Sequence, residues 1–301
     1  MKTKNRRISS LTNNEIEFIA KKYLEGESTQ NIAKFLKLNQ SSVIKKLKQL
    51  NLHVKYKNPK LRKRKRTCND YFFSKIDTEE KAYWLGFIAA DGCVRIDKRK
   101  RKNLTINLSL SDENQIYKFS QSIKSNNIIS RRKNYSKKYK KYYDASSITI
   151  SSQQLIDDLI NLGITPRKSL TLRYPQINNK FDKDFIRGYF DGDGCWHINM
   201  NKNYRPSLVF NIIGSDYFIE TLTKKLNNIT TNSKGSKTKN GKISVFSCDA
   251  TIGSLEIANY IYKNATIYME RKKNIVNIFL KNDKAFNRKR IKRYKLPKIL
   301  F

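Results

Sequence analysis

The chain has 301 residues, enough for two or three compact domains, and its 63 Lys and Arg residues far outnumber its 25 Asp and Glu residues. A formal net charge of +38 would strain a compact monomer unless a polyanion is its normal partner, and nucleic acid is the leading candidate. No apolar run approaches the ~20 residues of a membrane span and no signal-peptide pattern opens the chain, so we expect an intracellular protein that is neither secreted nor bound to membranes.

The cysteines and histidines do not form a metal-binding pattern. The four cysteines lie far apart without a Cys-x-x-Cys pair, and the chain has 2 histidines, so a zinc finger is not supported. Cys93 and Cys195 each follow an Asp-Gly pair, which favours small buried thiols. His197 lies close to one of these pairs, but a lone histidine near a motif is weak support for a histidine general base.

Residues 1–53 are expected to form a helix-turn-helix domain. Apolar residues between Ile32 and Leu47 have the spacing of that motif, although Lys37 takes a turn position that is often Gly. A small three-helix bundle that binds a protein would have the same pattern, but the net charge favours DNA. If the third helix enters the major groove, bases or phosphates would be contacted by Gln40, Ser41, Ser42 and Lys45.

Residues 54–70 are expected to form a basic linker, because six basic residues lie within Lys60–Arg66 and no core can form there. Such a segment can follow the phosphate backbone or enter a minor groove. A nuclear import signal would have the same composition. If the linker binds DNA, we expect the contacts to come from Arg62, Arg64 and Arg66.

One phrase occurs twice in the rest of the chain. Residues 83–94 are YWLGFIAADGCV and residues 185–196 are FIRGYFDGDGCW, which places Asp91 and Asp193 102 positions apart (193 − 91). Each phrase is apolar enough on all sides to predict a buried helix. The helix dipole disfavours a carboxylate at the C-terminal end by a few tenths to ~1 kcal/mol. One such Asp before Gly would be an ordinary helix stop, but a matched pair indicates two sites for a cation.

A nearly constant offset indicates an internal duplication beyond these helices. The Ser-Asp pair ending at Asp112 returns at Asp216, and Arg167-Lys168 returns as Arg271-Lys272, each 104 positions later (216 − 112 and 272 − 168). Alternating apolar residues in both copies predict antiparallel strands. We therefore expect two α+β halves at residues 71–180 and 181–285, followed by a basic tail at residues 286–301.

The two predicted helices can pack side by side if a pseudo-two-fold axis relates the halves. Gly86 and Gly188 would then allow the backbones to approach closely. The two aspartates would emerge at one end, where they repel each other unless a hard divalent cation such as Mg²⁺ neutralises them. The alternative is that both aspartates are structural helix ends. The metal site that we expect comprises Asp91, Asp193, Ala90 and Gly192.

The segments WLGFIAADG and IRGYFDGDG resemble the two signature helices of single-chain LAGLIDADG homing endonucleases. The final Asp of each signature matches Asp91 and Asp193, whereas Ala89 departs from the consensus that Asp191 keeps. The resemblance covers about residues 71–280. It implies saddle-shaped antiparallel sheets around two central packed helices. It also implies a site-specific double-strand DNA endonuclease that uses Mg²⁺ or Mn²⁺ to hydrolyse one phosphodiester on each strand across the minor groove.

The resemblance further implies a lysine near each scissile phosphate, one domain's length after each motif. Lys168 and Lys272 occupy these positions and would stabilise transition-state charge or activate water, with Lys273 as a rival for the second site. The sheets would lie along the major groove, so that the basic loops 97–102, 131–143 and 200–205 face DNA. The candidate contacts in these loops are Lys98, Arg99, Lys100, Arg101, Arg131, Arg132 and Lys202.

The sequence leaves two classes of function open for this fold. Retention of both Asp91 and Asp193 favours an active, metal-dependent endonuclease that acts as a monomer on a long, asymmetric duplex target. The alternative is a binder of the same fold that does not cleave, either a transcription regulator or an RNA maturase. A purely structural chromatin protein would leave the duplicated Asp-Gly helices unexplained.

Overall fold

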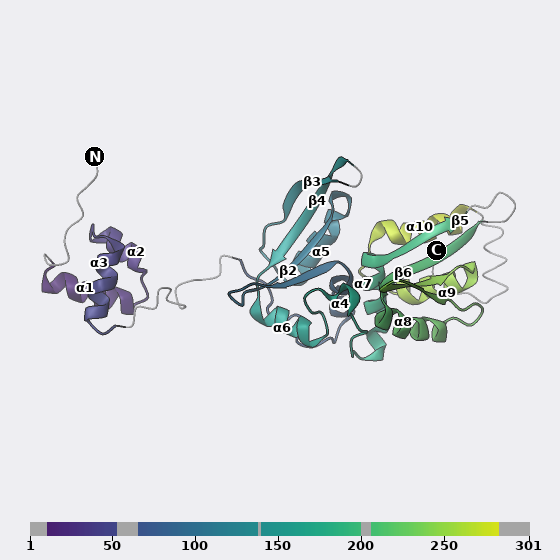
Figure 1. The fold of residues 1–301 in the computed structure, drawn as a ribbon, viewed down its shortest axis with the longest axis horizontal. Coiled ribbons are helices and arrows are strands. Elements are labelled where there is room, and N and C mark those ends of the chain that lie inside the picture. The colour runs from purple at the N-terminus through teal and green to yellow at the C-terminus, as the bar shows by residue number, and fades with distance from the viewer. Residues whose placement is uncertain (1–10, 53–65, 138–139, 200–205, 283–301) are drawn as a thin grey trace. The chain divides into compact units, whose positions relative to one another are not determined.

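The computed structural model describes residues 11–52, 66–137, 140–199 and 206–282 (Figure 1). The chain divides into two compact units, Met1–Arg66 and Thr67–Phe301. Within the described ranges, the structure contains no helix with the length and apolar character of a membrane span. Several predictions lie outside these ranges: most of the basic linker with Arg62 and Arg64, the loop at residues 200–205 with Lys202, and the tail at residues 286–301.

The described part of the first unit holds α1 (Asn13–Leu24), α2 (Thr29–Phe35) and α3 (Gln40–Gln49). α1 begins in a capping box, in which Thr12 and Glu15 each accept a hydrogen bond from the backbone amide of the other. Lys37, in the turn before α3, has a φ of 53°, in the left-handed region that favours glycine. The apolar spacing predicted from the sequence forms a small core of Ile19, Ile32, Ala33, Leu38, Val43 and Leu47.

The second unit is built around two central helices whose backbones touch, α4 (Glu79–Asp91) and α7 (Asp182–Asp193). A Cβ atom on Gly86 would lie 2.0 Å from the Phe185 carbonyl oxygen, and one on Gly188 would lie 1.9 Å from the Tyr83 carbonyl oxygen. Any larger residue at either position would push the helices apart. Both helices are buried on most sides, as their apolar character predicts.

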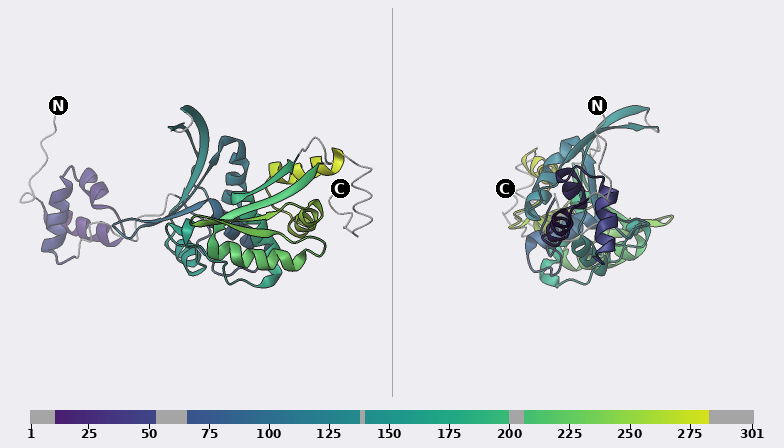
Figure 2. Two further views of the ribbon diagram at one scale, coloured as in Figure 1. Left: turned by 45° about the vertical axis from the view of Figure 1, so that its right-hand side comes forward. Right: turned by 90° about the vertical axis from the view of Figure 1, so that its left-hand side faces the viewer.

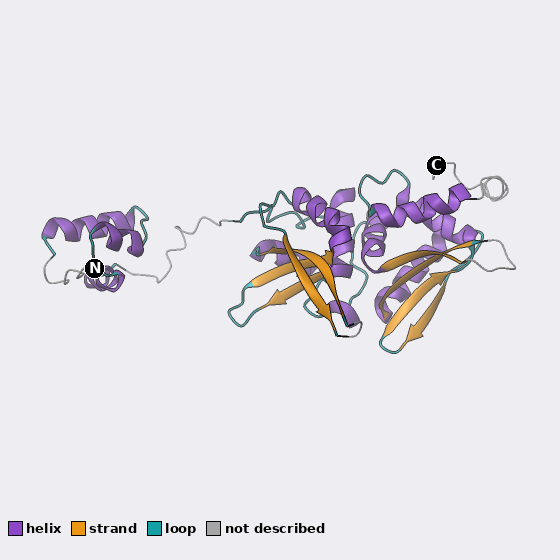
Figure 3. Ribbon diagram, turned by 90° about the horizontal axis from the view of Figure 1, so that it is seen from above, coloured by secondary structure: helices purple, strands orange, loops and turns teal. Residues whose placement is uncertain are grey.

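Each central helix leads directly into the first strand of a four-stranded antiparallel sheet (Figure 3). The first sheet has the order β1-β2-β4-β3 and contains β1 (Gly92–Ile96), β2 (Lys102–Ser109), β3 (Ser130–Ser136) and β4 (Lys141–Ile150). The second has the order β5-β6-β8-β7 and contains β5 (Gly194–Asn199), β6 (Ser207–Ser215), β7 (Ser236–Asn240) and β8 (Ile243–Cys248). The shared order confirms the predicted α+β class and the predicted duplication.

Each half also places one α-helix after its second strand and one after its fourth strand. The first half holds η3 (Leu110–Asp112), α5 (Glu113–Ser122), α6 (Gln153–Asn161) and η4 (Lys168–Leu170). The second half holds η5 (Asn179–Phe181), α8 (Asp216–Ile229), α9 (Thr251–Tyr262) and α10 (Glu270–Asn282). The β3–β4 hairpin extends well beyond the body of its half (Figure 2). One continuous hydrophobic core runs through both halves.

The buried positions of α5 and α8, the helices that follow β2 and β6, show that the predicted alignment of these two helices is wrong by one residue. The buried apolar residues Ile116 and Phe119 of α5 match Ile219 and Leu222 of α8, an offset of 103 (219 − 116 and 222 − 119) in place of the predicted 104. The predicted match of Asp112 with Asp216 is therefore wrong, because the first half inserts the turn η3 before α5. Asp216 instead corresponds to Glu113, and each pairs with a strand residue, as Asp216–Lys237 and Glu113–Arg131.

Each sheet turns one face toward the core and leaves the other open. In the first sheet, Thr105 and Thr149 are register partners on the open face, and their hydroxyl oxygens lie 3.1 Å apart. Cys93 and Cys195 are exposed and pair with residues of the open faces. The prediction of buried thiols is therefore wrong, because strand alternation turns these side chains away from the core. The opposite face of the first sheet is buried through Leu104, Ile106, Leu108, Ile148 and Ile150.

Candidate active site

The C-terminal ends of α4 and α7 place two aspartates close together. Asp91 and Asp193 are the last residues of these helices, and the glycine that follows each one begins a strand. A Cβ atom on Gly192 would lie 2.3 Å from the Ala90 Cβ atom and 3.2 Å from Asp91 Oδ2. The small residue before each aspartate therefore permits this close approach of the helix ends.

Burial makes both carboxylates harder to ionise than an exposed aspartate. Burial, followed by the charge of Asp193, raises the pKa of Asp91 to about 6. Burial also raises the pKa of Asp193, although the charges of Lys168 and Lys272 oppose this shift. Within the described residues, no hydrogen bond or ion pair holds the Asp91 carboxylate. A bound cation would stabilise the ionised forms of both aspartates.

The donor set fits a hard divalent cation. Mg²⁺ is commonly held by one or two carboxylates together with water and substrate phosphate, and Mn²⁺ also suits carboxylate and water oxygens. The described residues contain no cluster of three or more His, Cys, Asp or Glu side chains that could hold a metal. A cation at Asp91 and Asp193 would therefore complete its coordination with carbonyl, water or phosphate oxygens.

Two buried lysines close the C-terminal ends of the central helices, where backbone carbonyls lack partners within the helix. Lys168 Nζ donates to the carbonyl oxygens of Ala90 at 3.1 Å and Gly92 at 2.6 Å. The two lysines are 7% and 4% exposed. Burial lowers the pKa of Lys168, and it lowers the pKa of Lys272 to about 8. Lys272 Nζ lies within 3.2 Å of four carbonyl oxygens, those of Phe190, Asp191, Gly192 and Gly194.

These contacts bear on three of the sequence predictions. Ala90 and Gly192 were predicted at the metal site. In the structure the Ala90 carbonyl oxygen accepts a hydrogen bond from Lys168, and the Gly192 carbonyl oxygen accepts one from Lys272. Lys273 Nζ lies 4.0 Å from the centre of the Tyr268 ring and takes no part in this contact. The structural counterpart of Lys168 is therefore Lys272.

The sequence around the first central helix matches a known protein family. Residues 78–169 match the model of the LAGLIDADG-like domain. The match begins at the residue that caps α4 and includes both Asp91 and Lys168. The match therefore falls on the first half of the second unit, and the other half has the same strand order.

A comparison with curated proteins gave no match. Solved structures of LAGLIDADG proteins are similar to this chain in fold. The LAGLIDADG meganuclease I-AabMI bound to uncleaved DNA is 13% identical with a TM-score of 0.47, over 72% of this chain and 94% of that one. The homing endonuclease I-WcaI bound to its DNA recognition sequence is 16% identical with a TM-score of 0.46, over 66% and 87%. The LAGLIDADG homing endonuclease I-SmaMI bound to cleaved DNA is 14% identical with a TM-score of 0.46, over 73% and 96%.

The residues directly before the two lysines differ in backbone conformation, and this difference was not predicted from the sequence. Arg167, directly before Lys168, has a φ of 60° and a ψ of 32°, a left-handed conformation that costs a non-glycine residue about 1–2 kcal/mol. Such strain clusters at functional sites. Lys272 follows a residue of regular helix instead, because Arg271 lies inside α10.

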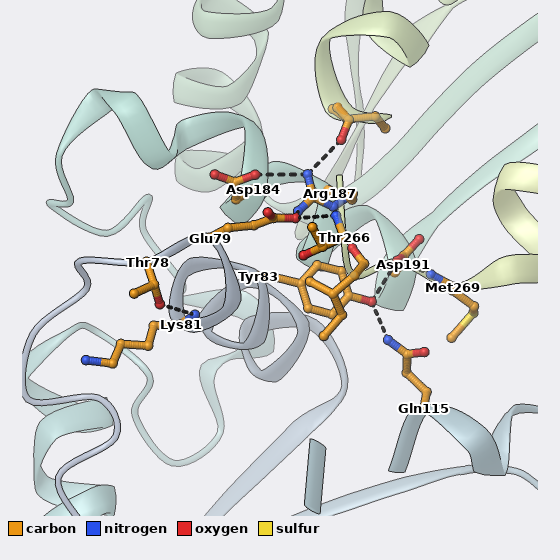
Figure 4. Close-up of polar contacts among 12 residues, drawn as sticks. Thr78, Glu79, Lys81, Tyr83, Gln115, Asp184, Arg187, Asp191, Thr266 and Met269 are labelled. Carbon is orange, nitrogen blue, oxygen red and sulfur yellow. Dashed lines mark hydrogen bonds and ion pairs between the residues drawn. The ribbon is translucent and has the colours of Figure 1, made fainter. Parts of the chain in front are cut away.

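A buried polar cluster between the central helices was also missed (Figure 4). Asp191, on α7, is 1% exposed, and its Oδ2 atom accepts a hydrogen bond from Tyr83 Oη of α4 at 2.7 Å. Arg187, fully buried on α7, donates to Asp184 at 3.0 Å and to Glu79 of α4 at 2.8 Å. The one signal in the sequence was the departure at Ala89, where the first motif lacks the carboxylate of Asp191.

The structure brings together only part of the predicted DNA contacts of the second unit. Arg132 has Ala145 as its register partner on the open face, whereas Arg131 is opposite Ser146 on the core-facing side. Arg131 makes two hydrogen bonds with Glu113, at 2.7 and 2.6 Å, and so does not belong to the open face. The residues exposed at the tip of the β1–β2 hairpin are Lys98, Arg99, Lys100 and Arg101.

The predicted contacts of the first unit lie at the start of α3. Gln40, Ser41 and Lys45 are exposed, and Ser42 is half-buried. The Gln40 side-chain amide donates to Thr29 Oγ1 at 2.9 Å, so Gln40 would have to leave this partner to contact a base. Arg66, at the end of the linker, is exposed.

Proposed function

We propose that this protein is a site-specific, metal-dependent double-strand DNA endonuclease that hydrolyses one phosphodiester on each strand across the minor groove. One observation carries the proposal: two related halves bring Asp91 and Asp193 together at the end of the central helix pair, with a buried lysine on each helix end. The match of residues 78–169 to the LAGLIDADG-like domain supports it. The net charge of +38 suits a DNA partner.

Asp91 and Asp193 would hold Mg²⁺ or Mn²⁺. When bound, such a cation activates water and stabilises the leaving oxygen in phosphodiester hydrolysis. The carboxylates are carried by buried helix ends, so their positions are fixed before DNA binds. Because the two side chains lie at one point between the halves, each strand cut would depend on both of them.

Lys168 and Lys272 would act near the two scissile phosphates, one on each strand. Hydrogen bonds to helix-end carbonyls hold both Nζ atoms in place, which lets them stabilise developing negative charge without rearrangement. The lowered pKa of Lys272, about 8, also makes its ammonium group easier to deprotonate than that of an exposed lysine. Lys272 could therefore exchange a proton with the attacking water near neutral pH.

The open sheet faces would lie along the major groove on either side of the cut. Hydroxyl and amide side chains on these faces, such as Thr105, Thr149 and Asn211, can hydrogen-bond to base edges. Arg132 and the basic tip at residues 98–101 would contact phosphates. The two faces carry different residues, so a single chain would recognise a long, asymmetric target as a monomer.

The first unit would add a second DNA contact. Its third helix, α3, would enter the major groove through Gln40, Ser41, Ser42 and Lys45, and the basic linker with Arg62, Arg64 and Arg66 would follow the phosphate backbone. This contact would lengthen the target without changing the chemistry at Asp91 and Asp193.

A randomised duplex library tests the function directly. We expect incubation with Mg²⁺, followed by sequencing of the new ends, to return one recurring site cut on both strands. The matched controls are the same incubation in EDTA and the Asp91→Asn variant, neither of which should produce ends. If the protein binds a specific DNA sequence but produces no new DNA ends with either Mg²⁺ or Mn²⁺, the proposal is overturned. That result would favour a binder of the same fold that does not cleave.

A further inference from the structure

The stretch at residues 266–271, called here the Lys272 segment, belongs to the second half but is held by side chains of the first half. Asp112, at the end of η3, accepts two hydrogen bonds from the guanidinium group of Arg271, at 2.7 and 2.9 Å. Arg271 directly precedes Lys272. A pair of parallel bonds from one guanidinium group constrains direction as well as distance, so this contact restrains the backbone from which Lys272 extends.

Two further contacts hold the start and the middle of the Lys272 segment. Glu79 Oε1 accepts a hydrogen bond from the Thr266 backbone amide at 2.8 Å. Lys118 Nζ donates to the Tyr268 carbonyl oxygen at 3.2 Å. Glu79 lies on α4 and Lys118 on α5, so both contacts come from the first half.

A buried relay joins the Lys272 segment to both central helices (Figure 4). The Met269 backbone amide donates to Asp191 Oδ2 at 2.6 Å, and the same oxygen accepts a hydrogen bond from Tyr83 Oη at 2.7 Å. Tyr83 Oη in turn accepts a hydrogen bond from the Gln115 side-chain amide. The buried Asp191 Oδ1 atom has no partner among the described residues, so the two bonds to Oδ2 orient this carboxylate.

The opposite side of the helix pair lacks the groups to build the same relay. The residues that correspond to Tyr83, Asp191 and Gln115 are Phe185, Ala89 and Phe218, none of which has a polar side chain. Across the described ranges, residues 162–167 make no side-chain hydrogen bond or ion pair with the second half. The first such contact comes after Lys168, where Ser215 Oγ donates to the Leu172 carbonyl oxygen.

We propose that Asp112, Tyr83 and Asp191 are positioning residues for Lys272. Asp112 and Tyr83 belong to the first half, and Tyr83 acts through Asp191 of the second half, so that the first half sets the geometry of the lysine that the second half supplies. Lys168 is positioned within its own half. The inference rests on the proposed endonuclease function, because it concerns a lysine assigned to one strand. It follows that the two strand cuts respond unequally when the contacts to the Lys272 segment are weakened.

Strand-resolved cleavage of an end-labelled duplex tests the inference, with Lys272→Met identifying the strand whose cut depends on Lys272. Asp112→Asn and Tyr83→Phe should each slow that strand about tenfold or more and change the other by less than about twofold, because a misplacement of ~1 Å can reduce a rate ~100-fold. A general loss of stability would instead slow both strands alike.

Glu113→Gln is the matched control for Asp112→Asn. It weakens a bidentate pair with Arg131 that resembles the Asp112–Arg271 pair, one residue away, without touching the Lys272 segment. The ratio of the two strand rates should therefore match that of the unmodified protein. Equal slowing of both strands by Asp112→Asn, or the same change of ratio in Glu113→Gln, would overturn the positioning role.

Amide hydrogen exchange on the protein without DNA or metal separates this inference from the proposed function. In Asp112→Asn and Tyr83→Phe, the amides of residues 266–271 should exchange faster, while those of residues 162–167 should not change. Unchanged exchange in the Lys272 segment would overturn the inference whatever happens to cleavage. Faster exchange there, in a protein that cuts no DNA even when unmodified, would support the positioning contacts and refute the endonuclease.

Discussion

The two halves of the second unit share one fold but differ in the side chains that they present to each other. Strand order, the glycine contact, the aspartate and the buried lysine are the same in both. The central helix of the second half, however, carries Arg187 and Asp191 where that of the first has Leu85 and Ala89. The two halves therefore carry the same residue types at the glycine contact and at the last residue of each central helix. They carry different residue types at other positions of the interface between them.

Arg187, which has no charged counterpart in the first half, donates hydrogen bonds to four residues. It is fully buried and donates to the carbonyl oxygens of Ile267 at 2.8 Å and Ile261 at 2.7 Å, in addition to Asp184 and Glu79. Burial raises the pKa of Asp184 even though Arg187 lies beside it. At Asp184 the cost of desolvation therefore exceeds the attraction of Arg187, and we expect the cluster to specify how the halves join more than to add stability.

The largest effect is expected at the residues that the two halves have in common. Asp91→Asn and Asp193→Asn should each reduce cleavage of both strands by about 10³-fold or more, because both carboxylates serve one shared point. DNA should still be retained by either variant in a gel shift with EDTA. A variant that loses the cut on one strand alone would show that the metal site is not shared.

A smaller effect is expected where the halves differ. Arg187→Leu places the residue of the first half in the second, and it removes the ion-pair partner of Asp184 and Glu79. We expect this change to lower the free energy of unfolding by about 3–5 kcal/mol in chemical denaturation. Lys224→Leu, which removes an exposed pair with Glu220, should change it by less than about 1 kcal/mol. Similar values for both variants would contradict a structural role for the buried cluster.

Removing residues 1–53 extends the comparison to the first unit, which lies outside the duplication. We expect the truncated protein to bind its target about tenfold more weakly or worse and to protect a shorter stretch of DNA, because it loses basic contacts to phosphate. Cleavage at saturating protein should be unchanged. A footprint of unchanged length would show that this unit does not contact the target.

The smallest effect concerns pH in the absence of metal. The folded pKa of Asp91, about 6, lies above the ~3.9 of an unfolded aspartate, so between these values the folded state binds more protons than the unfolded state. The free energy of unfolding should therefore fall as pH rises from about 4 to about 6. Asp191, with a pKa of about 6, adds to the same trend. A steeper fall in Asp91→Asn than in the unmodified protein would contradict the shift.

The features that repeat along the chain could be predicted from its sequence. Two mostly apolar helices with a central glycine have few ways to be buried other than against each other, and Gly86 and Gly188 lie at this contact. The closeness of the two terminal aspartates could be predicted as well, because both helices end at the same position of the repeat. The strand order also repeats, since each half carries the same succession of apolar alternation and helix.

The features that distinguish neighbouring residues could not be predicted, because they depend on tertiary geometry. Lys272 and Lys273 are chemically identical, and only the direction of each side chain decides which one meets the helix-end carbonyls. Arg131 and Arg132 differ only in strand parity. The partner of Arg187 at Glu79 lies 108 positions away, so no local pattern could indicate it.

Strand-resolved cleavage by Lys168→Met and Lys272→Met tests most directly the claim that each half supplies one lysine to one strand. Each variant should slow a different strand by about 10²–10³-fold, the usual loss for one well-placed charge donor, and should leave a nicked duplex. The two nicked products should carry their breaks on opposite strands of the end-labelled target. If both variants slow the two strands equally, or if neither is impaired, the assignment of Lys168 and Lys272 is contradicted.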